Sequence, residues 1–144
     1  MPPTQNSAPA PDLVARIRQK LTRQQFMHHI GADLTLIEPG RVEAELPLEL
    51  IHQQQRGFAH GGVIATMADL VAGFAGVTLI PDNYGMVTAD LKVSYLNPGI
   101  GKKIVAKGWV LKAGRRLHFC EAEVWCDEVL IAKATATMAV IEPN

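Results

Sequence analysis

One acidic side chain stands within a long apolar segment of this chain of 144 residues. Residues 60–80 read HGGVIATMADLVAGFAGVTLI, and Asp69 is the only charged residue after the histidine. Asp is almost never fully buried unless it is paired, so this position requires an explanation. Beside an apolar binding surface, a carboxylate could activate a water molecule or attack an electrophile directly.

Three interpretations of this segment compete. It could be a transmembrane span, because about 20 mostly apolar residues can cross a bilayer. It could be a helix buried in a soluble core with Asp69 facing a cleft, or Asp69 could lie on an exposed stripe. A span with Asp at its centre carries an insertion penalty of about 3 kcal/mol, and the segment lacks flanking cationic and aromatic anchors. Its four glycines, Gly61, Gly62, Gly73 and Gly76, suit close helix packing. The sequence therefore favours the buried helix.

The charges of the whole chain cancel. There are 14 basic and 14 acidic residues, and the isoelectric point is near 7.0. This balance argues against broad electrostatic binding to nucleic acid or to an anionic membrane. It leaves room for a local basic cluster that holds a small phosphorylated ligand.

The N-terminal residues and the cysteines favour a cytoplasmic location. Residues 1–11, MPPTQNSAPAP, lack the basic and apolar regions of a secretory signal, and we expect them to be a disordered lead. Cys120 and Cys126 fall within one predicted strand, so they should lie ~20 Å apart. A disulfide needs Cα atoms within about 7 Å, and free thiols fit a reducing compartment.

Periodic apolar residues predict the elements that must position Asp69. Apolar residues with helical spacing come first along the chain, and two alternating segments on either side of Pro39-Gly40 then predict a hairpin. The apolar helix must end before Pro81, because proline cannot continue a helix. After it, four alternating strands joined by short turns predict an antiparallel meander. The expected elements are a helix over 12–27 with Asp12 as N-cap, strands over 32–38 and 41–48, a polar loop over 49–59, the apolar helix, and strands over 86–96, 102–113, 116–126 and 129–142.

A helix that is apolar almost all round needs cover on every side, and a strongly curved antiparallel sheet of about six strands could wrap it. This α+β arrangement resembles the hotdog fold, with residues from about Gly61 to Leu79 as the central helix. We expect a single domain over residues 12–144.

The motifs of the chain resemble those of the hotdog acyl-CoA thioesterases of the phenylacetate-pathway (PaaI-like) group. The resemblance covers about residues 30–141 and rests on HGGVIATMADLVAG, VTADLKVSYLNPG and KAGRRLHFCEAEV, which occur in that order. It implies hydrolysis of an acyl-CoA to free acid and CoA, with no cofactor and no metal. The alternatives are a hotdog dehydratase or hydratase, whose His-Phe-Pro type motif is missing, and a non-catalytic acyl-CoA sensor.

The resemblance assigns Asp69 as general base or nucleophile and the backbone N–H of Gly61 as the group that polarises the thioester carbonyl. Unpaired N–H groups and the dipole at a helix N-terminus favour developing negative charge, and glycine lets a ligand approach the backbone. Gly61-Gly62 could instead only ease entry into the helix, and Asp69 could be a buried carboxylate at a subunit contact. His60 either bonds the acyl carbonyl or braces the loop.

Further residues are assigned by the same resemblance. Gln54 is expected to help hold the carbonyl or the attacking water, with Gln53 and Gln55 as neighbouring candidates. Thr88 could orient water or serve only as a good strand former. Lys112, Arg115 and Arg116 form the densest basic cluster and either bind the nucleotide end of coenzyme A or form a solvated hairpin tip.

The histidines show no metal-ligand spacing with cysteines or acids. Apart from His60, they are expected at the surface: His28, His29, His52 and His118.

Helix geometry predicts how the site is assembled. Gly61 and Asp69 are eight residues apart, hence ~12 Å apart along one helix, which an Asp side chain cannot span. A second copy packed antiparallel could bring its Asp69 beside the first Gly61. The sequence therefore predicts a homodimer with shared sites, and the resemblance adds pairing into a tetramer. The sequence does not indicate the length of the preferred acyl chain or whether that chain is aromatic or aliphatic.

Overall fold

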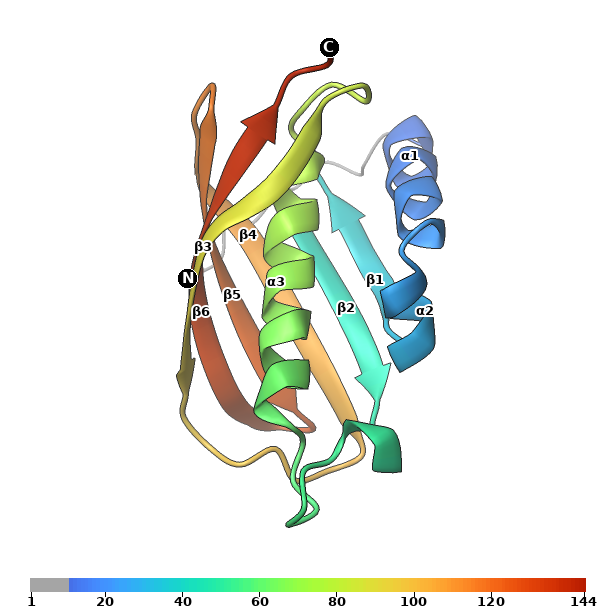
Figure 1. Ribbon diagram of the computed structural model, residues 1–144, viewed down its shortest axis with the longest axis vertical. Helices are drawn as coiled ribbons and strands as arrows, with labels where there is room; N and C mark the ends of the chain where they lie inside the picture. The colour runs from blue at the N-terminus through green and yellow to red at the C-terminus, as the bar shows by residue number, and fades with distance from the viewer. Residues whose placement is uncertain (1–10) are drawn as a thin grey trace.

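The apolar segment after His60 forms the longest helix, and the sheet is built around it. In the computed structural model, which describes residues 11–144, this helix is α3 (Gly61–Val77). It lies along the concave face of the sheet (Figure 1). The helix ends slightly before the predicted Leu79, and Thr78 is its C-cap.

Six antiparallel strands make one sheet, as predicted. Its order is β1-β2-β4-β5-β6-β3, and it curves around α3 (Figure 1). The strands are β1 (Asp33–Glu38), β2 (Arg41–Pro47), β3 (Gly85–Tyr95), β4 (Lys103–Ala113), β5 (Leu117–Cys126) and β6 (Val129–Ile141).

The prediction of a four-stranded meander is wrong for its first strand. Strands β4, β5 and β6 follow one another as hairpins, but β3 pairs with β6 and forms an edge of the sheet. The segment between β3 and β4 instead crosses below the N-terminal end of α3 (Figure 1). The N–H of Ala59 donates to the Gly99 carbonyl at 2.9 Å, and that of Leu48 donates to the Lys102 carbonyl at 2.8 Å. These bonds attach the crossing to both β2 and the loop before α3.

The first predicted helix is interrupted. It consists of two helices, α1 (Pro11–Thr22) and α2 (Gln25–Ile30), which a short non-helical link over residues 23–24 joins. Both helices lie beside β1 (Figure 1). At Gln24 the backbone leaves the helical region, with φ −88° and ψ 86°, and this break lets each helix bury its own apolar side chains. Asp12 lies in the first turn of α1 rather than at its N-cap. Apart from Pro11, the predicted lead of residues 1–11 falls outside the described residues.

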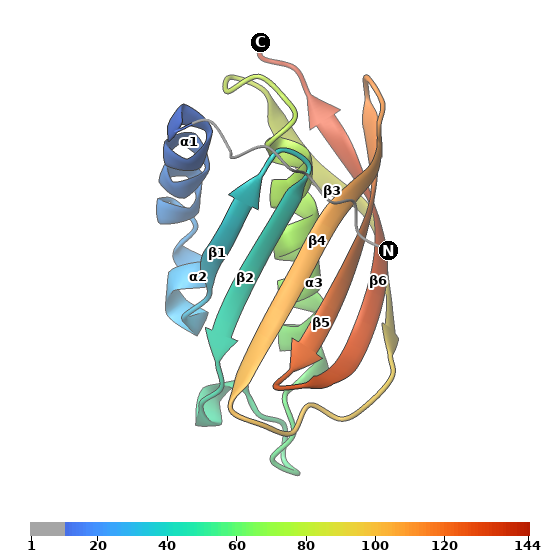
Figure 2. The same cartoon turned by 180° about the vertical axis from the view of Figure 1, so that it is seen from behind.

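The two edges of the sheet differ. Helices α1 and α2 lie alongside β1, whereas no described element pairs with the outer edge of β3. A 3-10 turn, η1 (Leu50–His52), follows β2. In residues 11–144 no helix covers the convex face (Figure 2). The outer edge of β3 therefore presents unpaired backbone N–H and C=O groups, which are a template for pairing with another chain.

Cys120 and Cys126 both lie buried on β5 as free thiols. Burial raises the pKa of Cys120 to about 12, and burial together with the charge of Asp127 raises the pKa of Cys126. Both thiols are therefore poor nucleophiles at neutral pH. Within the described part of the chain, no helix is long and apolar enough to cross a membrane.

Small residues allow α3 to approach the sheet closely. A Cβ atom at Gly108 would lie only 2.5 Å from the carbonyl carbon of Val71 in α3. Many of the buried residues on the same face of the sheet are alanines: Ala44, Ala106, Ala122, Ala132, Ala134 and Ala136.

We expect Gly108→Ala to lower the free energy of unfolding by about 2–3 kcal/mol, because the helix backbone must move away from the sheet. Chemical denaturation measures the change. The control is Gly73→Ala, where the added Cβ would lie 3.9 Å from Met138 Cε and should stabilise α3 slightly. Equal stability of the two variants would contradict the close-packing explanation.

Candidate active site

His60 is the N-cap of α3. Its Nδ1 accepts a hydrogen bond from the backbone N–H of Gly62 at 2.9 Å, so the proton of the neutral ring lies on Nε2. A Cβ atom at Gly62 would lie 3.0 Å from that Nδ1. Gly62 therefore makes room for the cap, and His60 braces the start of the helix.

Gly61 has no comparable reason within its own chain to be glycine. Its φ is not positive, and a Cβ atom would meet the Tyr95 ring at an ordinary 3.5 Å. Among the described residues, nothing accepts a hydrogen bond from the N–H of Gly61. The helix N-terminus thus keeps one free donor beside open space, where the helix dipole favours negative charge.

A cavity of about 350 Å³ lies beside this donor. Gln54, Gly61 and Tyr95 line it, and the Oε1 of Gln54 also accepts a hydrogen bond from the N–H of Arg56. We call it the Gly61 cavity. Gln53 lines a different cavity together with His60, and Gln55 lines neither. Of the three adjacent glutamines, Gln54 is the one that the structure places beside Gly61.

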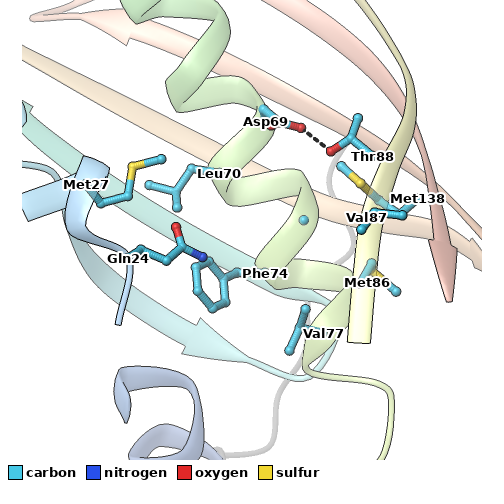
Figure 3. A pocket seen from close by; sticks show the side chains of 11 residues that line it. Gln24, Met27, Asp69, Leu70, Phe74, Val77, Met86, Val87, Thr88 and Met138 are labelled. Carbon is cyan, nitrogen blue, oxygen red and sulfur yellow. Dashed lines mark hydrogen bonds between the residues drawn. The ribbon is translucent and has the colours of Figure 1, made fainter. Parts of the chain in front are cut away.

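Asp69 lies midway along α3 and is held by Thr88 of β3. The hydroxyl of Thr88 donates to Asp69 Oδ1 at 2.6 Å (Figure 3). The carboxylate is half-buried, and within residues 11–144 its second oxygen has no hydrogen-bond partner. The hydroxyl of Thr88 retains lone pairs that can accept a hydrogen bond. Asp69 is therefore fixed in direction while one of its oxygens stays available.

The Asp69–Thr88 pair marks the polar end of a cavity of about 270 Å³, the Asp69 cavity (Figure 3). Most of the remaining lining is apolar and comes from α3, β3 and β6: Leu70, Phe74, Val77, Met86, Val87 and Met138. A carboxylate at the mouth of an apolar cavity can act on a polar group whose apolar remainder is buried.

A β-bulge in β3 accounts for the direction of Thr88. Thr88 pairs with Met138 and Asp90 with Thr137, so Ala89 is the extra residue. Simple alternation over residues 86–96 places the apolar residues at odd positions on one face and Thr88 on the other. The bulge shifts the alternation, so that Thr88 and Tyr95 both face α3.

The predicted catalytic residues form two groups in one chain. Gly61 and Gln54 line one cavity, whereas Asp69 and Thr88 line the other. The groups are separated by the ~12 Å that eight helical residues span. His60 lies in a third cavity on the α2 side of the same helix end.

Of the residues that line the Asp69 cavity, only Asp69 and Thr88 were predicted as site residues, and two of the others come from outside α3, β3 and β6. Gln24 and Met27, from the link before α2 and from α2 itself, form its outer wall (Figure 3). Their sequence gives no chemical signal, because only the break between α1 and α2 brings them over α3.

The prediction that all histidines except His60 lie at the surface is wrong for two of them. His52 is buried, where its Nδ1 accepts from the N–H of Glu49 and its Nε2 bonds the Ile30 carbonyl at 2.6 Å. His118 is buried, with its ring close to Gly76 of α3, and burial lowers its pKa. His52 ends the 3-10 turn η1 with its ring toward the interior, and His118 occupies an inward-facing position of β5. His28 and His29 are exposed, as predicted.

The basic cluster lies at the tip of the β4–β5 hairpin. Lys112, Arg115 and Arg116 are exposed there, and in the described part of the chain none of them forms an ion pair. Gly114 closes the tip, since a Cβ atom there would lie 2.7 Å from the Leu117 carbonyl oxygen. The hairpin tip lies at the end of the molecule opposite the N-terminal end of α3 (Figure 1).

Comparisons with known proteins identify the family of the chain. The thioesterase superfamily profile matches residues 56–133. The medium/long-chain acyl-CoA thioesterase YigI of Escherichia coli is 32% identical, and the match covers 89% of this chain and 97% of YigI.

Solved structures show the same fold. A thioesterase family protein from Silicibacter pomeroyi superposes with a TM-score of 0.86 at 32% identity, covering 90% of this chain and 98% of that one. The PaaI protein of E. coli, at 14% identity, has a TM-score of 0.83 and covers 92% and 95% of the two chains. The expected hotdog architecture is thus confirmed.

Proposed function

The chain belongs to the thioesterase superfamily and is a thioester hydrolase, and we propose that it hydrolyses acyl-CoA to a free acid and coenzyme A. The observation that carries this proposal is the Asp69 carboxylate, which Thr88 holds at the polar end of an apolar cavity. An acyl chain fits the apolar part, and the thioester carbonyl then lies near the carboxylate. The medium/long-chain acyl-CoA named for YigI is consistent with this choice.

In the proposed reaction the thioester carbonyl oxygen accepts a hydrogen bond from the N–H of Gly61. Negative charge develops on that oxygen as the carbonyl carbon becomes tetrahedral, and the helix N-terminus stabilises it. The glycine leaves space for the thioester, which explains a residue that neither conformation nor packing of this chain requires.

Asp69 supplies the attack on the carbonyl carbon by one of two routes. As a general base it takes a proton from water, whose oxygen bonds to the carbon while the C–S bond breaks and CoA leaves as thiolate. As a nucleophile its oxygen bonds to the carbonyl carbon, the C–S bond breaks and CoA leaves as thiolate, and water then hydrolyses the resulting anhydride. Thr88 orients the carboxylate in both routes, and its oxygen can accept from the attacking water. Gln54 assists at the carbonyl, and His60 maintains the helix start.

We propose that two chains complete each site. Gly61 of one chain would meet Asp69 of the other across a twofold axis. Support comes from the ~12 Å between these residues in one helix and from the unpaired edge of β3, which also carries Thr88. Two β3 edges can pair antiparallel, which suits a twofold dimer. Pairing of dimers into a tetramer and a cytoplasmic location remain parts of the same proposal.

The nucleotide end of coenzyme A is assigned to the β4–β5 hairpin. Its three cations are exposed and free of acidic partners within residues 11–144. Arg in particular binds phosphate through two parallel hydrogen bonds.

Asp69→Asn should lower kcat by about a hundredfold or more, because an amide is neither a base nor a nucleophile. Release of free thiol from a panel of acyl-CoA substrates measures turnover, and circular dichroism monitors folding. The matched control is Asp12→Asn, an exposed carboxylate on α1 outside the three cavities. Near-normal turnover of the Asp69 variant would remove this residue from the mechanism.

Replacing Arg115 and Arg116 together by Ala should raise KM for acyl-CoA about tenfold with little change in kcat. Lost phosphate contacts weaken ground state and transition state alike. The control substrate is a thioester of N-acetylcysteamine, which lacks the nucleotide and its phosphates. If KM rises equally for both substrates, the hairpin is not a phosphate site.

Mixing two inactive variants should restore activity if the sites are shared. Asp69→Ala removes the carboxylate. Gly61→Pro removes the N–H at the first helical position, where proline is tolerated, and the extended His60, with ψ 135°, suits a following proline. After joint unfolding and refolding in equal amounts, about half of the dimers are mixed. Each has one intact site of two, so roughly a quarter of wild-type activity should return.

Each variant refolded alone should stay inactive. Absence of activity in a mixture whose subunits are shown to exchange would contradict the shared site.

A further inference from the structure

Tyr95 contacts the residue that carries the free N–H. Its hydroxyl donates a hydrogen bond to the carbonyl oxygen of Gly61 at 2.8 Å. Its ring lies 3.5–3.6 Å from the position that a Cβ of Gly61 would occupy. The side chain is 53% exposed, so it does not merely fill the core. Tyr95 and Gly61 line the same cavity.

The bulge at Ala89 creates this contact. In an uninterrupted strand, Thr88 and Tyr95 would lie on opposite faces, because side chains alternate. With the bulge, both side chains reach α3, one at Asp69 and the other at Gly61. Strand β3 is therefore hydrogen-bonded to α3 at the two residues on which the proposed chemistry depends.

The start of α3 needs such a constraint. Two consecutive glycines have wide conformational freedom, and a first helical turn lacks preceding hydrogen-bond partners for its N–H groups. His60 fixes the N–H of Gly62, and Tyr95 fixes the carbonyl of Gly61. Gly61 is thereby held on its C-terminal side by two side chains, which restricts rotation about its backbone bonds and hence the direction of its own N–H.

We propose that Tyr95 is a positioning residue for the reaction, which aims the N–H of Gly61 at the thioester oxygen. This inference rests on the proposed function. The hydroxyl hydrogen of Tyr95 is engaged by the Gly61 carbonyl, so Tyr95 acts through Gly61 and does not itself protonate the substrate. Its effect is greatest when charge develops on the carbonyl oxygen, because misaligned donors stabilise an oxyanion poorly.

The test is Tyr95→Phe, which removes the hydroxyl and retains the exposed ring. Tyr84→Phe is the matched control, since Tyr84 is the only other tyrosine and its hydroxyl has no partner within residues 11–144. We expect kcat to fall about three- to tenfold for Tyr95→Phe, the loss of one hydrogen bond, with KM changed less than about twofold. The control should match wild type.

Two non-hydrolysable ligands separate aiming from general support of the fold. The first is an acyl-CoA analogue in which a difluoromethylene replaces sulfur, so that the ketone readily becomes tetrahedral and places its oxygen where charge develops in the reaction. The second is an alkyl-CoA thioether without a carbonyl. Tyr95→Phe should bind the ketone more weakly, by about the same three- to tenfold factor as kcat, and the thioether with unchanged affinity.

Unchanged kcat, or equal weakening of both ligands, would overturn the role of Tyr95. These results are distinguishable from failure of the proposed function. If wild type releases no thiol from any acyl-CoA, or Asp69→Asn remains active, the proposed function fails. If Asp69→Asn is inactive while Tyr95→Phe equals wild type, only the positioning role fails.

Discussion

Helix α3 needs apolar cover around most of its circumference, and the rest of the fold follows from that requirement. The concave sheet covers one side, with alanines and Gly108 allowing close contact. Strand β3 at one edge and the α1–α2 pair beyond the other edge extend this cover (Figure 1). Between them the chain leaves the Asp69 cavity, lined from both sides. The cavity and the unpaired edge of β3 lie together, so one partner chain could complete both.

The β3 bulge links the sheet to the proposed chemistry. A single extra residue, Ala89, turns Thr88 and Tyr95 toward the same helix, and their hydroxyls bond Asp69 and Gly61. Edge strands tolerate bulges readily, and bulges commonly redirect a side chain near a site. The same strand that would join two chains therefore also orients the groups that each chain contributes. In the proposed dimer, a shift of the β3 edge would move the Asp69 carboxylate through its hydrogen bond to Thr88, and Gly61 through its hydrogen bond to Tyr95.

Strong local patterns in the sequence predicted much of this structure. A run of apolar residues bounded by His60 and Pro81 favoured a buried helix over a membrane span, because Asp69 stands at its centre and flanking anchors are missing. The strands follow from alternation. The edge position of β3 could not be read, because its pairing with β6 depends on contacts made by the crossing segment at Ala59 and Leu48. The helix break at Gln24 likewise depends on tertiary packing against β1.

Site residues could be predicted where the residue type itself is unusual for its surroundings. They could not be predicted where the backbone geometry decides which way a side chain points. Asp69 is conspicuous because it is the lone charge of an apolar helix. The direction of Thr88 was hidden by the bulge, which the alternating sequence contradicts. Tyr95 reads as an ordinary strand aromatic, although its hydroxyl reaches Gly61. His60 became interpretable only when its ring was found to cap α3.

The central claim is that one thioester is held by Gly61 of one chain and Asp69 of another, because ~12 Å of helix separates them within a chain. The most direct test is a crystal structure with the ketone analogue of an acyl-CoA bound. We expect a dimer in which the ketone oxygen lies about 3 Å from the N of Gly61 of one subunit, while the carboxylate nearest the carbonyl carbon is Asp69 of the other. A ketone whose carbon lies nearest Asp69 of the subunit that supplies Gly61, or whose oxygen lies away from Gly61, would contradict it.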